Sequence, residues 1–436
     1  LGKSLFRSGY NLFSTKDYMS RVRGGHNFIK IRIGDEKIKG AADEVDIIVA
    51  LNNETIDKHL DNLSEDGILI YEKNIDDLNN SISVPAKKIA SEINSKALNI
   101  VYVGALLKII GKDIANTEKL ISEYFNDNKK IEDNKALLKK GFDYVEKTFD
   151  LPKVKKNEDK MFIDGNEAVG LGAAAAGVSF YSAYPMSPST GILNYLAKNQ
   201  QKLGIAVEQA EDEIGAINMA LGASYGGIRS MVGTSGGGFS LMAEAIGMAG
   251  IGEIPIVIAE VQRPGPATGL PTRTSQGDLQ FAINISQGEF PIMVMAPRDQ
   301  EDAFYQTFRA HNLAEKYQIP VILLSDQYLA DSKTDINMIN EDDLEIKRYF
   351  INNNDKEKEE IYKRYKLSDD GISPRIYPGF YEDDTILVDS HEHNEYGRVT
   401  EDEELRNKML AKRENKIEKL IKDDLNEPVY IGDEDI

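Results

Sequence analysis

Short apolar runs alternate with amphipathic segments along the first third of the chain. The amphipathic stretches TIDKHLDNL and VPAKKIASEIN have the spacing of helices. The apolar, largely β-branched runs predict strands: NFIKIRI (27–33), VDIIVAL (45–51), GILIYE (67–72) and LNIVYVGAL (98–106). This alternation predicts a small α/β domain around a largely parallel sheet in residues 1–125. The opening LGKSLFRSGYNLF has the pattern of a helix that leads into a strand.

A second alternating pattern follows a charge-rich helix and linker at 126–160. It opens with FIDGNEAVGLGAAAAGVSFYSAYP, which predicts a helix of small residues and then a strand. Four more strands are expected: IRSMVGT (228–234), IPIVIAEV (254–261), FPIMVMAP (290–297) and IPVILLSD (319–326). Helices intervene, notably at 300–317, so residues 161–332 are expected to form a doubly wound parallel sheet.

The last hundred residues have a different character. Residues 333–436 are polar and turn-rich, and we expect a partly helical linker with one charged helix near 399–424 and an acidic tail. The chain begins with Leu in what resembles the second half of a helix, so we expect the sequence to be a fragment at both ends.

Composition narrows the class of protein. The formal net charge of −20 disfavours general binding to nucleic acid or to an anionic membrane. The chain has no Cys, which excludes disulfides, cysteine-ligated zinc and iron–sulfur clusters within it. No apolar stretch has transmembrane length and no secretion signal opens the sequence, so we expect a soluble cytoplasmic protein.

The run Tyr184-Pro185-Met186-Ser187-Pro188-Ser189-Thr190 lies between a predicted strand and a predicted helix. Prolines on both sides of Ser187 restrict the backbone and fix where hydroxyls and amides point. Hydroxyls and helix N-terminal amides suit polar or anionic atoms, but Ser and Thr are also common helix caps. On its own, this run favours an ordinary cap.

Four acidic residues precede the helix IGAINMALGASYGG: Glu208, Glu211, Asp212 and Glu213. Acidic side chains at a helix start interact favourably with the helix dipole, which is their commonest role. The functional alternative places one partly buried carboxylate at the end of a strand, where it hydrogen-bonds a heteroaromatic ring.

Two loops after predicted strands are further candidates. Thr234-Ser235-Gly236-Gly237-Gly238 could bring backbone amides against a ligand, although it matches no nucleotide fingerprint. The loop 263–274 contains three prolines, two guanidinium groups and three hydroxyls directly after a buried strand. Arginine offers a planar fork to a carboxylate, so this second loop favours a binding site over a surface turn.

The histidines are weaker candidates. His26 in RGGHNF could act as a donor or acid/base on a glycine turn, or be structural. His391 and His393 lack further defined metal ligands, so we interpret them as loop residues and predict no metal site.

Taken in order, these segments resemble the α subunit of 2-oxoacid:ferredoxin oxidoreductases with a γ domain fused ahead of it, especially the 2-oxoglutarate branch. The α resemblance spans about 161–332 and is highly specific, and SHEHNEYGRVTEDEELRNKMLAKR is similar to the stretch that follows. The γ resemblance is carried by GYNLFSTKDYMSRVRGGHNFIKIRI and VDIIVALNNETIDKHLDNL within 1–125. The family's Gly-rich γ start and its domain beyond about residue 424 are not matched.

The resemblance implies thiamine diphosphate chemistry, with decarboxylation of a 2-oxoacid, electron transfer to ferredoxin and acyl transfer to coenzyme A. It assigns Glu213, in Glu213-Ile214-Gly215-Ala216, to the aminopyrimidine ring, with Glu211 as the alternative. Ser187 stands where the family usually has Thr, and Arg263 with Thr272 matches the clamp for the substrate carboxylate. Further cofactor contacts are expected from Tyr184, Pro185, Thr234 and Ser235.

The resemblance also implies that this chain is catalytically incomplete alone. We find no segment of the kind that binds diphosphate through Mg²⁺, and in the family that site and the iron–sulfur cluster belong to a β subunit. The expected function is therefore the α subunit of a 2-oxoglutarate or broad 2-oxoacid enzyme. The alternatives are a pyruvate or branched-chain oxoacid homologue, another thiamine-dependent enzyme that does not use ferredoxin, and a non-catalytic subunit.

Overall fold

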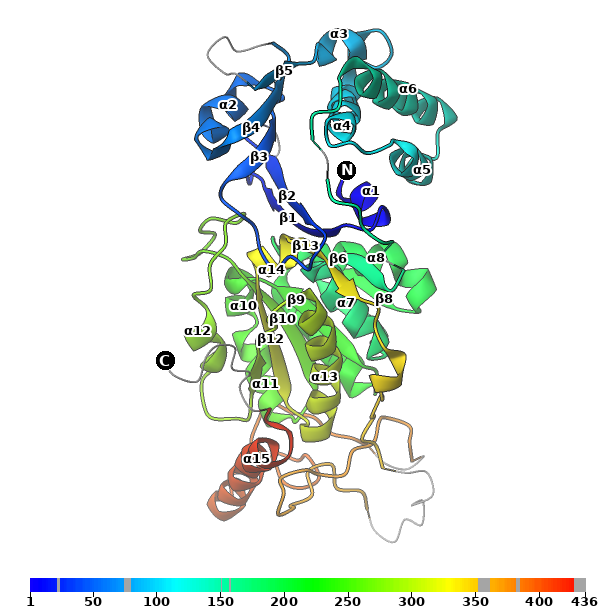
Figure 1. Ribbon diagram of the computed structural model, residues 1–436. Helices are drawn as coiled ribbons and strands as arrows, with labels where there is room; N and C mark the ends of the chain where they lie inside the picture. The colour runs from blue at the N-terminus through cyan, green and yellow to red at the C-terminus, as the bar shows by residue number, and fades with distance from the viewer. Residues whose placement is uncertain are drawn as a thin grey trace, which may run out of the picture. The chain divides into compact units, whose positions relative to one another are not determined.

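The structure is a computed structural model of the chain. It describes residues 1–21, 24–73, 80–149, 151–156, 158–351, 361–381 and 385–426. The described residues fall into two compact units (Figure 1). The first comprises Leu1–Ile163 and Ser332–Met338, and the second comprises Asp164–Asp331 and Ile339–Ile436.

The first unit contains two sheets. One has the strand order β2-β1-β13-β6, and β1 pairs antiparallel with both β2 and β13. The other has the order β3-β4-β5, and its neighbouring strands are parallel. The strands are β1 (Asn11–Asp17), β2 (Phe28–Gly34), β3 (Val45–Val49), β4 (Leu63–Tyr71), β5 (Ser81–Ser83), β6 (Lys160–Asp164) and β13 (Lys333–Asn337).

The expectation of one largely parallel sheet here is correct for β3–β5 and wrong for β1 and β2. These two strands form an antiparallel pair over seven residue pairs, from Asn11↔Gly34 to Asp17↔Phe28. Gly24 and Gly25, near the end of the connection, both have φ of +85°, a conformation that glycine adopts without strain. The chain therefore returns directly beside β1, and the described residues of the connection contain no crossover helix.

The apolar run 98–106 was expected to be a strand and is instead part of helix α4 (Leu98–Ile109). This helix packs against α6 (Asn128–Tyr144). A Cβ added at Gly104 would meet the backbone oxygen of Leu138, and one at Gly141 would meet that of Val101. The two glycines thus allow the helices to approach closely and bury α4, which explains its continuous apolar sequence.

The other helices of the first unit are short or exposed on one side. They are α1 (Gly2–Arg7), α2 (Asn53–His59), η1 (Leu60–Asn62), α3 (Ala86–Ser91), η2 (Ser95–Ala97) and α5 (Ala115–Tyr124). The helix followed by a strand expected at the start of the chain is confirmed by α1 and β1.

The second unit is built on the expected parallel sheet. Its strand order is β11-β12-β10-β9-β7-β8, and the pairings from β11 to β8 are parallel. The strands are β7 (Phe180–Ala183), β8 (Ala206–Gln209), β9 (Ser230–Thr234), β10 (Ile256–Gln262), β11 (Met293–Met295) and β12 (Pro320–Asp326). The mixed α/β fold class predicted from the sequence is confirmed.

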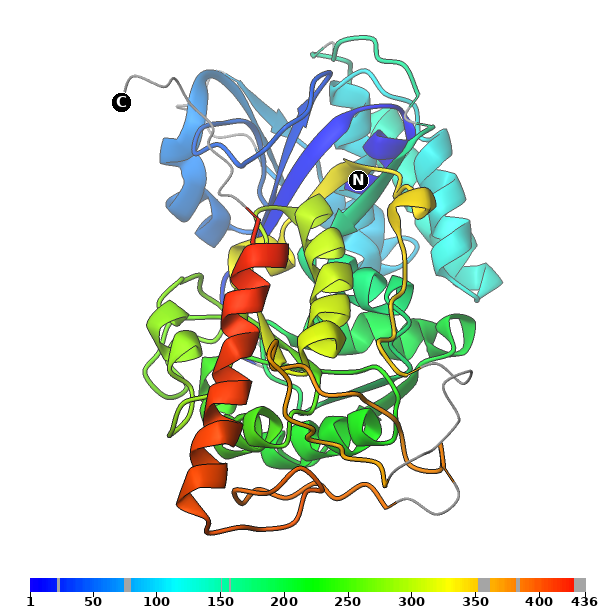
Figure 2. The same ribbon diagram turned by 90° about the horizontal axis from the view of Figure 1, so that it is seen from below.

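Helices cover both sides of this sheet (Figures 1 and 2). Small and apolar residues of the helices after β8 and β9, including Ala216, Ala220 and Ile246, pack with Ile256 and Ile258 of β10. The helices are α7 (Gly165–Ala175), α8 (Thr190–Leu203), α9 (Glu213–Tyr225), α10 (Gly236–Leu241), α11 (Ala243–Ile251), α12 (Leu279–Ile283), α13 (Gln300–Tyr317), α14 (Gln327–Asp331), η3 (Glu341–Asp343) and α15 (Glu403–Asp424).

The charged helix α15, red in Figure 2, is held to the rest of its unit by buried ions. Lys412 and Lys416 each donate to one carboxylate oxygen of Glu253, at 2.6 Å, and all three side chains are buried. Burial lowers the pKa of Lys416 to about 8, although the Glu253 carboxylate acts in the opposite direction. At the C-terminal end of α15, Lys316 donates to Asp424 at 2.5 Å.

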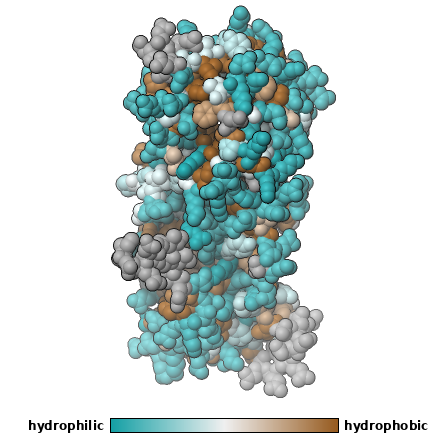
Figure 3. Space-filling view, in the orientation of Figure 1, coloured by the Kyte–Doolittle hydropathy of each residue, from teal (hydrophilic) through white to brown (hydrophobic). Residues whose placement is uncertain are grey.

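Hydrophilic side chains predominate on the face shown in Figure 3, with smaller apolar areas between them. No helix in the described part of the chain is long and apolar enough to cross a membrane.

Candidate active site

The sheet of the second unit has a topological switch point between β7 and β9. The chain passes from β7 to β8 on one side and then returns to β9 on the other side. In open parallel sheets, ligands bind at the carboxyl ends of the strands where this reversal occurs. Tyr184–Thr190 directly follows β7, Thr234–Gly238 follows β9, and the loop 263–274 follows β10. Three of the candidate segments therefore reach the same edge.

The loop after β7 is fixed by hydrogen bonds from buried side chains. Ser189 donates through Oγ to the backbone oxygen of Met186 at 2.8 Å. Asn166 of α7 donates through Nδ2 to the backbone oxygen of Pro188 at 3.2 Å. Ser189 lies at the N-cap of α8 but makes no side-chain cap bond, so the cap alternative does not explain this residue. Ser187 is partly exposed, and Tyr184 is 40% exposed.

The acidic residues before α9 have different roles. Asp212 caps the helix by accepting a hydrogen bond from Gly215 N at 2.7 Å, which is the structural role anticipated for this group. Glu211 is exposed. Glu213 is only 4% exposed, and its Oε1 is buried without a hydrogen-bond partner among the described residues. A buried carboxylate oxygen with no donor is costly, so Glu213 has the character of a binding group.

The glycine turn after β9 makes room for Glu213. A Cβ on Gly238 would lie 2.6 Å from Glu213 Oε1 and would also meet Thr234 Oγ1. Thr234 and Ser235 are fully buried, and Ser235 Oγ has no partner in the described part of the chain. The glycine-rich turn therefore brings the start of α10 close to both the Glu213 carboxylate and the Thr234 hydroxyl.

The loop after β10 is connected to both of these segments. Arg263 donates through Nη1 to the backbone oxygen of Ser187 at 2.6 Å. Burial lowers the pKa of the Arg263 guanidinium, and the Glu213 carboxylate partly offsets this effect. Arg263 Nε is buried and has no acceptor among the described residues. Thr272, also buried, lies on the same loop.

Glu260, which was not identified from the sequence, lies on β10 just before this loop. Glu260 of β10 is fully buried, and neither of its carboxylate oxygens has a hydrogen-bond donor within the described residues. Burial, and next the Asp278 carboxyl, raise the pKa of Glu260 well above its usual range. The available signal was a single acidic residue within the apolar strand IPIVIAEV.

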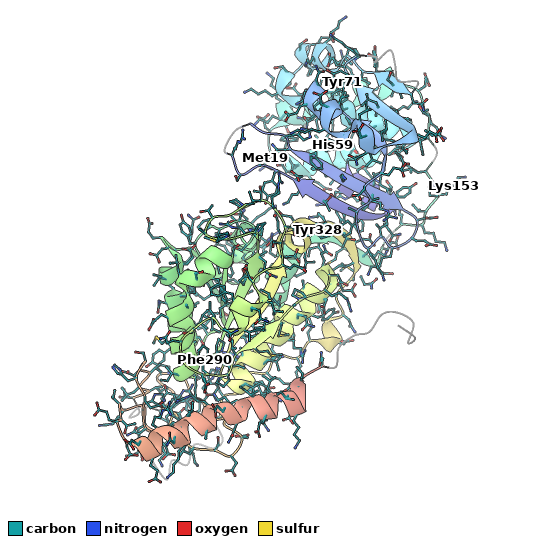
Figure 4. The ribbon with its side chains drawn as sticks, turned by 90° about the vertical axis from the view of Figure 1, so that its left-hand side faces the viewer. Met19, His59, Tyr71, Lys153, Phe290 and Tyr328 are labelled. Atoms are coloured by element: carbon teal, nitrogen blue, oxygen red, sulfur yellow. The ribbon has the colours of Figure 1, made fainter. Side chains whose placement is uncertain are left out.

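The candidate histidines have partners of other kinds. In the first unit, His26 is buried and its Nε2 lies 2.8 Å from Nε2 of His59, which is labelled in Figure 4. In the second unit, His393 is buried against Tyr365, with a ring-centroid distance of 3.9 Å, while His391 pairs with Asp389. Among the described residues, no group of three or more His, Cys, Asp and Glu side chains is arranged to hold a metal ion.

The chain is similar to known proteins over most of its length. Residues 171–412 match the family model of the pyruvate flavodoxin/ferredoxin oxidoreductase thiamine diphosphate-binding domain. Residues 1–144 match the model named pyruvate ferredoxin/flavodoxin oxidoreductase. The α subunit of a 2-oxoacid:ferredoxin oxidoreductase from Sulfolobus is 34% identical, over 96% of this chain and 75% of its own length. The chain belongs to the 2-oxoacid:ferredoxin oxidoreductase α-subunit family.

Two other relatives of this oxidoreductase α subunit carry names that specify a substrate. The 2-oxoglutarate synthase subunit KorA of Methanocaldococcus jannaschii is 37% identical over 59% of this chain and 68% of its own length. The solved structure of 2-oxoglutarate:ferredoxin oxidoreductase from Magnetococcus marinus, with 2-oxoglutarate, coenzyme A and succinyl-CoA bound, has a TM-score of 0.87 and 31% identity. That match covers 98% of this chain and 77% of the other. The predicted family is confirmed, and the naming of the relatives as α subunits indicates a heteromeric complex.

The residues at the switch point fit a thiamine diphosphate ring. Glu213 Oε1 is a buried acceptor without a donor, and Arg263 Nε is a buried donor without an acceptor, both within the part of the chain that the structure describes. An aminopyrimidine offers ring nitrogens and an amino group, and a 2-oxoacid offers a carboxylate. The two unmatched groups are thus of the types that these ligands would satisfy.

Proposed function

We propose that this chain is the α subunit of a 2-oxoglutarate:ferredoxin oxidoreductase that acts only together with a β subunit. The reaction is the oxidative decarboxylation of 2-oxoglutarate to succinyl-CoA and CO₂, with two electrons passed to ferredoxin. Residues 161–332 are assigned to the thiamine diphosphate domain, and residues 1–125 to a γ-type domain. The observation that carries the proposal is the buried Glu213 carboxylate, whose Oε1 has no hydrogen-bond partner among the described residues, beside Arg263 at the switch point.

Glu213 is assigned to a ring nitrogen of the aminopyrimidine. Because its carboxylate is buried at the start of α9, a hydrogen bond that it accepts there is little weakened by water. Thiamine diphosphate, when bound, supplies a carbanion at its thiazolium ring and an electron sink for the loss of CO₂. Glu213 would hold the ring proton that this chemistry requires. Thr234 and Ser235 would supply hydroxyls to the cofactor, and Tyr184 and Pro185 would border it.

Arg263 and Thr272 are assigned to the carboxylate of the 2-oxoacid. A guanidinium forms charge-assisted hydrogen bonds to a carboxylate and fixes its orientation. The Ser187 backbone oxygen already holds Arg263 Nη1, so the side chain is oriented before substrate binds. The Ser187 hydroxyl would add a hydrogen bond to substrate or cofactor. Coenzyme A is the co-substrate, while the Mg²⁺–diphosphate site and the iron–sulfur cluster are expected on the β subunit.

The substrate assignment is supported by the names of the 2-oxoglutarate relatives. A pyruvate or branched-chain oxoacid enzyme would need the same guanidinium for the shared carboxylate and would differ in the lining of the pocket. A non-catalytic subunit would not need a buried Glu213 whose Oε1 has no hydrogen-bond partner in the described part of the chain.

The test is to isolate the complex from the native cell and to assay viologen reduction with coenzyme A and each oxoacid. Reduction that depends on 2-oxoglutarate, together with a cysteine-rich partner, supports the proposal. Turnover restricted to pyruvate or branched oxoacids changes the substrate and keeps the family chemistry. An isolated chain with no partner and no thiamine-dependent turnover would falsify the enzymatic role.

A second test separates the two candidate carboxylates. Glu213→Gln in the complex is expected to lower kcat by about 100-fold or more, the usual scale for a lost acid–base group. If Glu211→Gln has this effect and Glu213→Gln does not, the aminopyrimidine contact moves to Glu211.

A further inference from the structure

A buried carboxyl group and a partly buried one lie at the two ends of the loop that carries Arg263 and Thr272. Glu260 precedes the loop on β10, and Asp278 follows it at the N-cap of α12. Glu260 is fully buried. Both of its carboxylate oxygens, and Oδ2 of Asp278, are buried and receive no hydrogen bond from a donor within the described residues.

The backbone around these carboxyl groups leaves little space. A Cβ on Gly236, at the start of α10, would lie only 2.7 Å from Asp278 Oδ2. Gln262 accepts from Asp278 N through Oε1, at 2.9 Å, and donates through Nε2 to the backbone oxygen of Ser325, at 3.1 Å. These contacts hold Asp278 against the end of β10, where the Glu260 side chain lies.

Few other charged side chains lie near enough to Glu260 and Asp278 to offset the repulsion between their carboxylates. Beside Glu260 in the sheet stand Thr234 of β9 and Leu324 of β12, neither of which ionises. On the helices of this side, Glu213 of α9 lies against Gly238, and Glu244 of α11 is exposed.

Asp326, at the end of β12, is engaged elsewhere. It accepts hydrogen bonds from Gln276 Nε2 at 2.8 Å and from Leu329 N at 3.0 Å. The Arg263 guanidinium interacts with Glu213 and Ser187. Asp278 is therefore the charged group that acts on Glu260.

Two facing carboxylates without a donor repel each other strongly in a buried site. One proton between them replaces this repulsion with a hydrogen bond, and the pair then titrates as a unit. Burial and Asp278 raise the pKa of Glu260, and burial also raises the pKa of Asp278, which agrees with a proton retained near neutral pH.

We propose that Glu260 and Asp278 share one proton and are positioning residues. They join the end of β10 to the start of α12 and so hold the intervening loop, with Arg263 and Thr272, in place. The role of that loop in substrate binding rests on the proposed function. Loss of the proton to solvent at alkaline pH leaves two carboxylates that separate, and the loop shifts with them. Substrate binding is then weakened more than the chemical step.

The first experiment uses the full chain and does not depend on activity. Infrared spectra at neutral pH are expected to show the carbonyl stretch of a protonated carboxylic acid, which disappears at alkaline pH. Glu260→Gln should remove this band, because its amide donates to Asp278 without an ionisable proton. Glu244→Gln, an exposed carboxylate on α11, should leave the band unchanged. Should Glu260→Gln fail to fold, Asp278→Asn replaces it. A band that persists in the folded variant overturns the shared proton.

The second experiment uses the assembled complex. In the wild type, KM for the 2-oxoacid is expected to rise roughly 10- to 100-fold as the pH becomes alkaline, with a smaller change in kcat. Glu260→Gln should remove most of this rise, whereas a purely structural role for Glu260 would leave the pH profile unchanged and overturn the proposal. A complex without 2-oxoacid turnover refutes the proposed function, while the infrared result still decides whether the proton is shared.

Discussion

Arg263 donates a 2.6 Å hydrogen bond from Nη1 to the backbone oxygen of Ser187 and thereby joins the loop after β10 to the loop after β7. The two residues are 76 positions apart in sequence, yet both follow strands of the same sheet. The contact fixes one end of the guanidinium and leaves Nε buried without an acceptor among the described residues. Arg263 is thus pre-oriented to bind an anionic group.

Arg263→Lys is expected to lower kcat/KM for the 2-oxoacid by roughly 10- to 100-fold, since a hydrogen bond to a charged group contributes about 1.5–3 kcal/mol. Lysine keeps the charge but cannot hold Ser187 and a carboxylate with one planar group. Steady-state kinetics of the assembled complex measure kcat/KM for the 2-oxoacid. Arg298→Lys, on an exposed side chain, is the matched control, and equal kinetics for both variants would contradict the assignment.

Gly238→Ala is expected to reduce activity sharply while the chain still folds. The new Cβ would lie 2.6 Å from Glu213 Oε1 and would displace this carboxylate from its place at the start of α9. The measurement is thiamine diphosphate affinity and viologen reduction in the complex.

Gly222→Ala on α9 is the control for Gly238→Ala. Nothing lies within 4 Å of its added Cβ, and alanine favours a helix by about 1 kcal/mol over glycine. Full activity in Gly238→Ala would mean that catalysis does not require the Glu213 carboxylate at its present position.

Strands β9, β10 and β12 of the second unit could be predicted because they are buried on both faces, whereas the mostly exposed β8 was not predicted. Strands such as β10 and β12 are buried and mostly apolar, and they lie between helices of ordinary length. The helix 300–317 was also predicted with the bounds that α13 has, since Asp299 caps its start and its apolar spacing is regular.

The run 98–106 could not be assigned in the same way. A fully buried helix and a buried strand are both continuously apolar, so periodicity does not distinguish them. Packing against α6 makes this run helical. Gly104 and Gly141 let α4 and α6 approach closely, and this contact joins segments far apart in sequence. For a similar reason the sequence did not reveal the Glu260–Asp278 pair, because Asp278 reaches β10 only through the fold of the loop between them.

Glu253→Gln is expected to lower the free energy of unfolding by about 3–5 kcal/mol, because it leaves Lys412 and Lys416 buried without a countercharge. Glu404→Gln, which breaks an exposed pair with Lys408 on the same helix, should change it by less than about 0.5 kcal/mol. Urea unfolding measures both variants.

The loss of stability caused by Glu253→Gln should depend on pH. Burial alone would raise the pKa of Glu253, but Lys412, Lys416 and Arg364 outweigh it and hold the pKa well below its usual range. The stabilisation is therefore present above the ordinary glutamate pKa and is lost as the pH falls. A difference between wild type and Glu253→Gln that stays constant in acid would contradict this account.

Glu260 should give a pH dependence of stability with the opposite sign. Its pKa in the folded chain is raised, so the unfolded chain loses this proton first as the pH rises. The free energy of unfolding is thus expected to decrease from the ordinary glutamate pKa upward, until the folded pair itself ionises. Urea unfolding of the full chain across this range should show a shallower decrease for Glu260→Gln than for the wild type. Parallel curves for the two proteins would mean that Glu260 is ionised in the folded state, because only a retained proton produces the difference in slope.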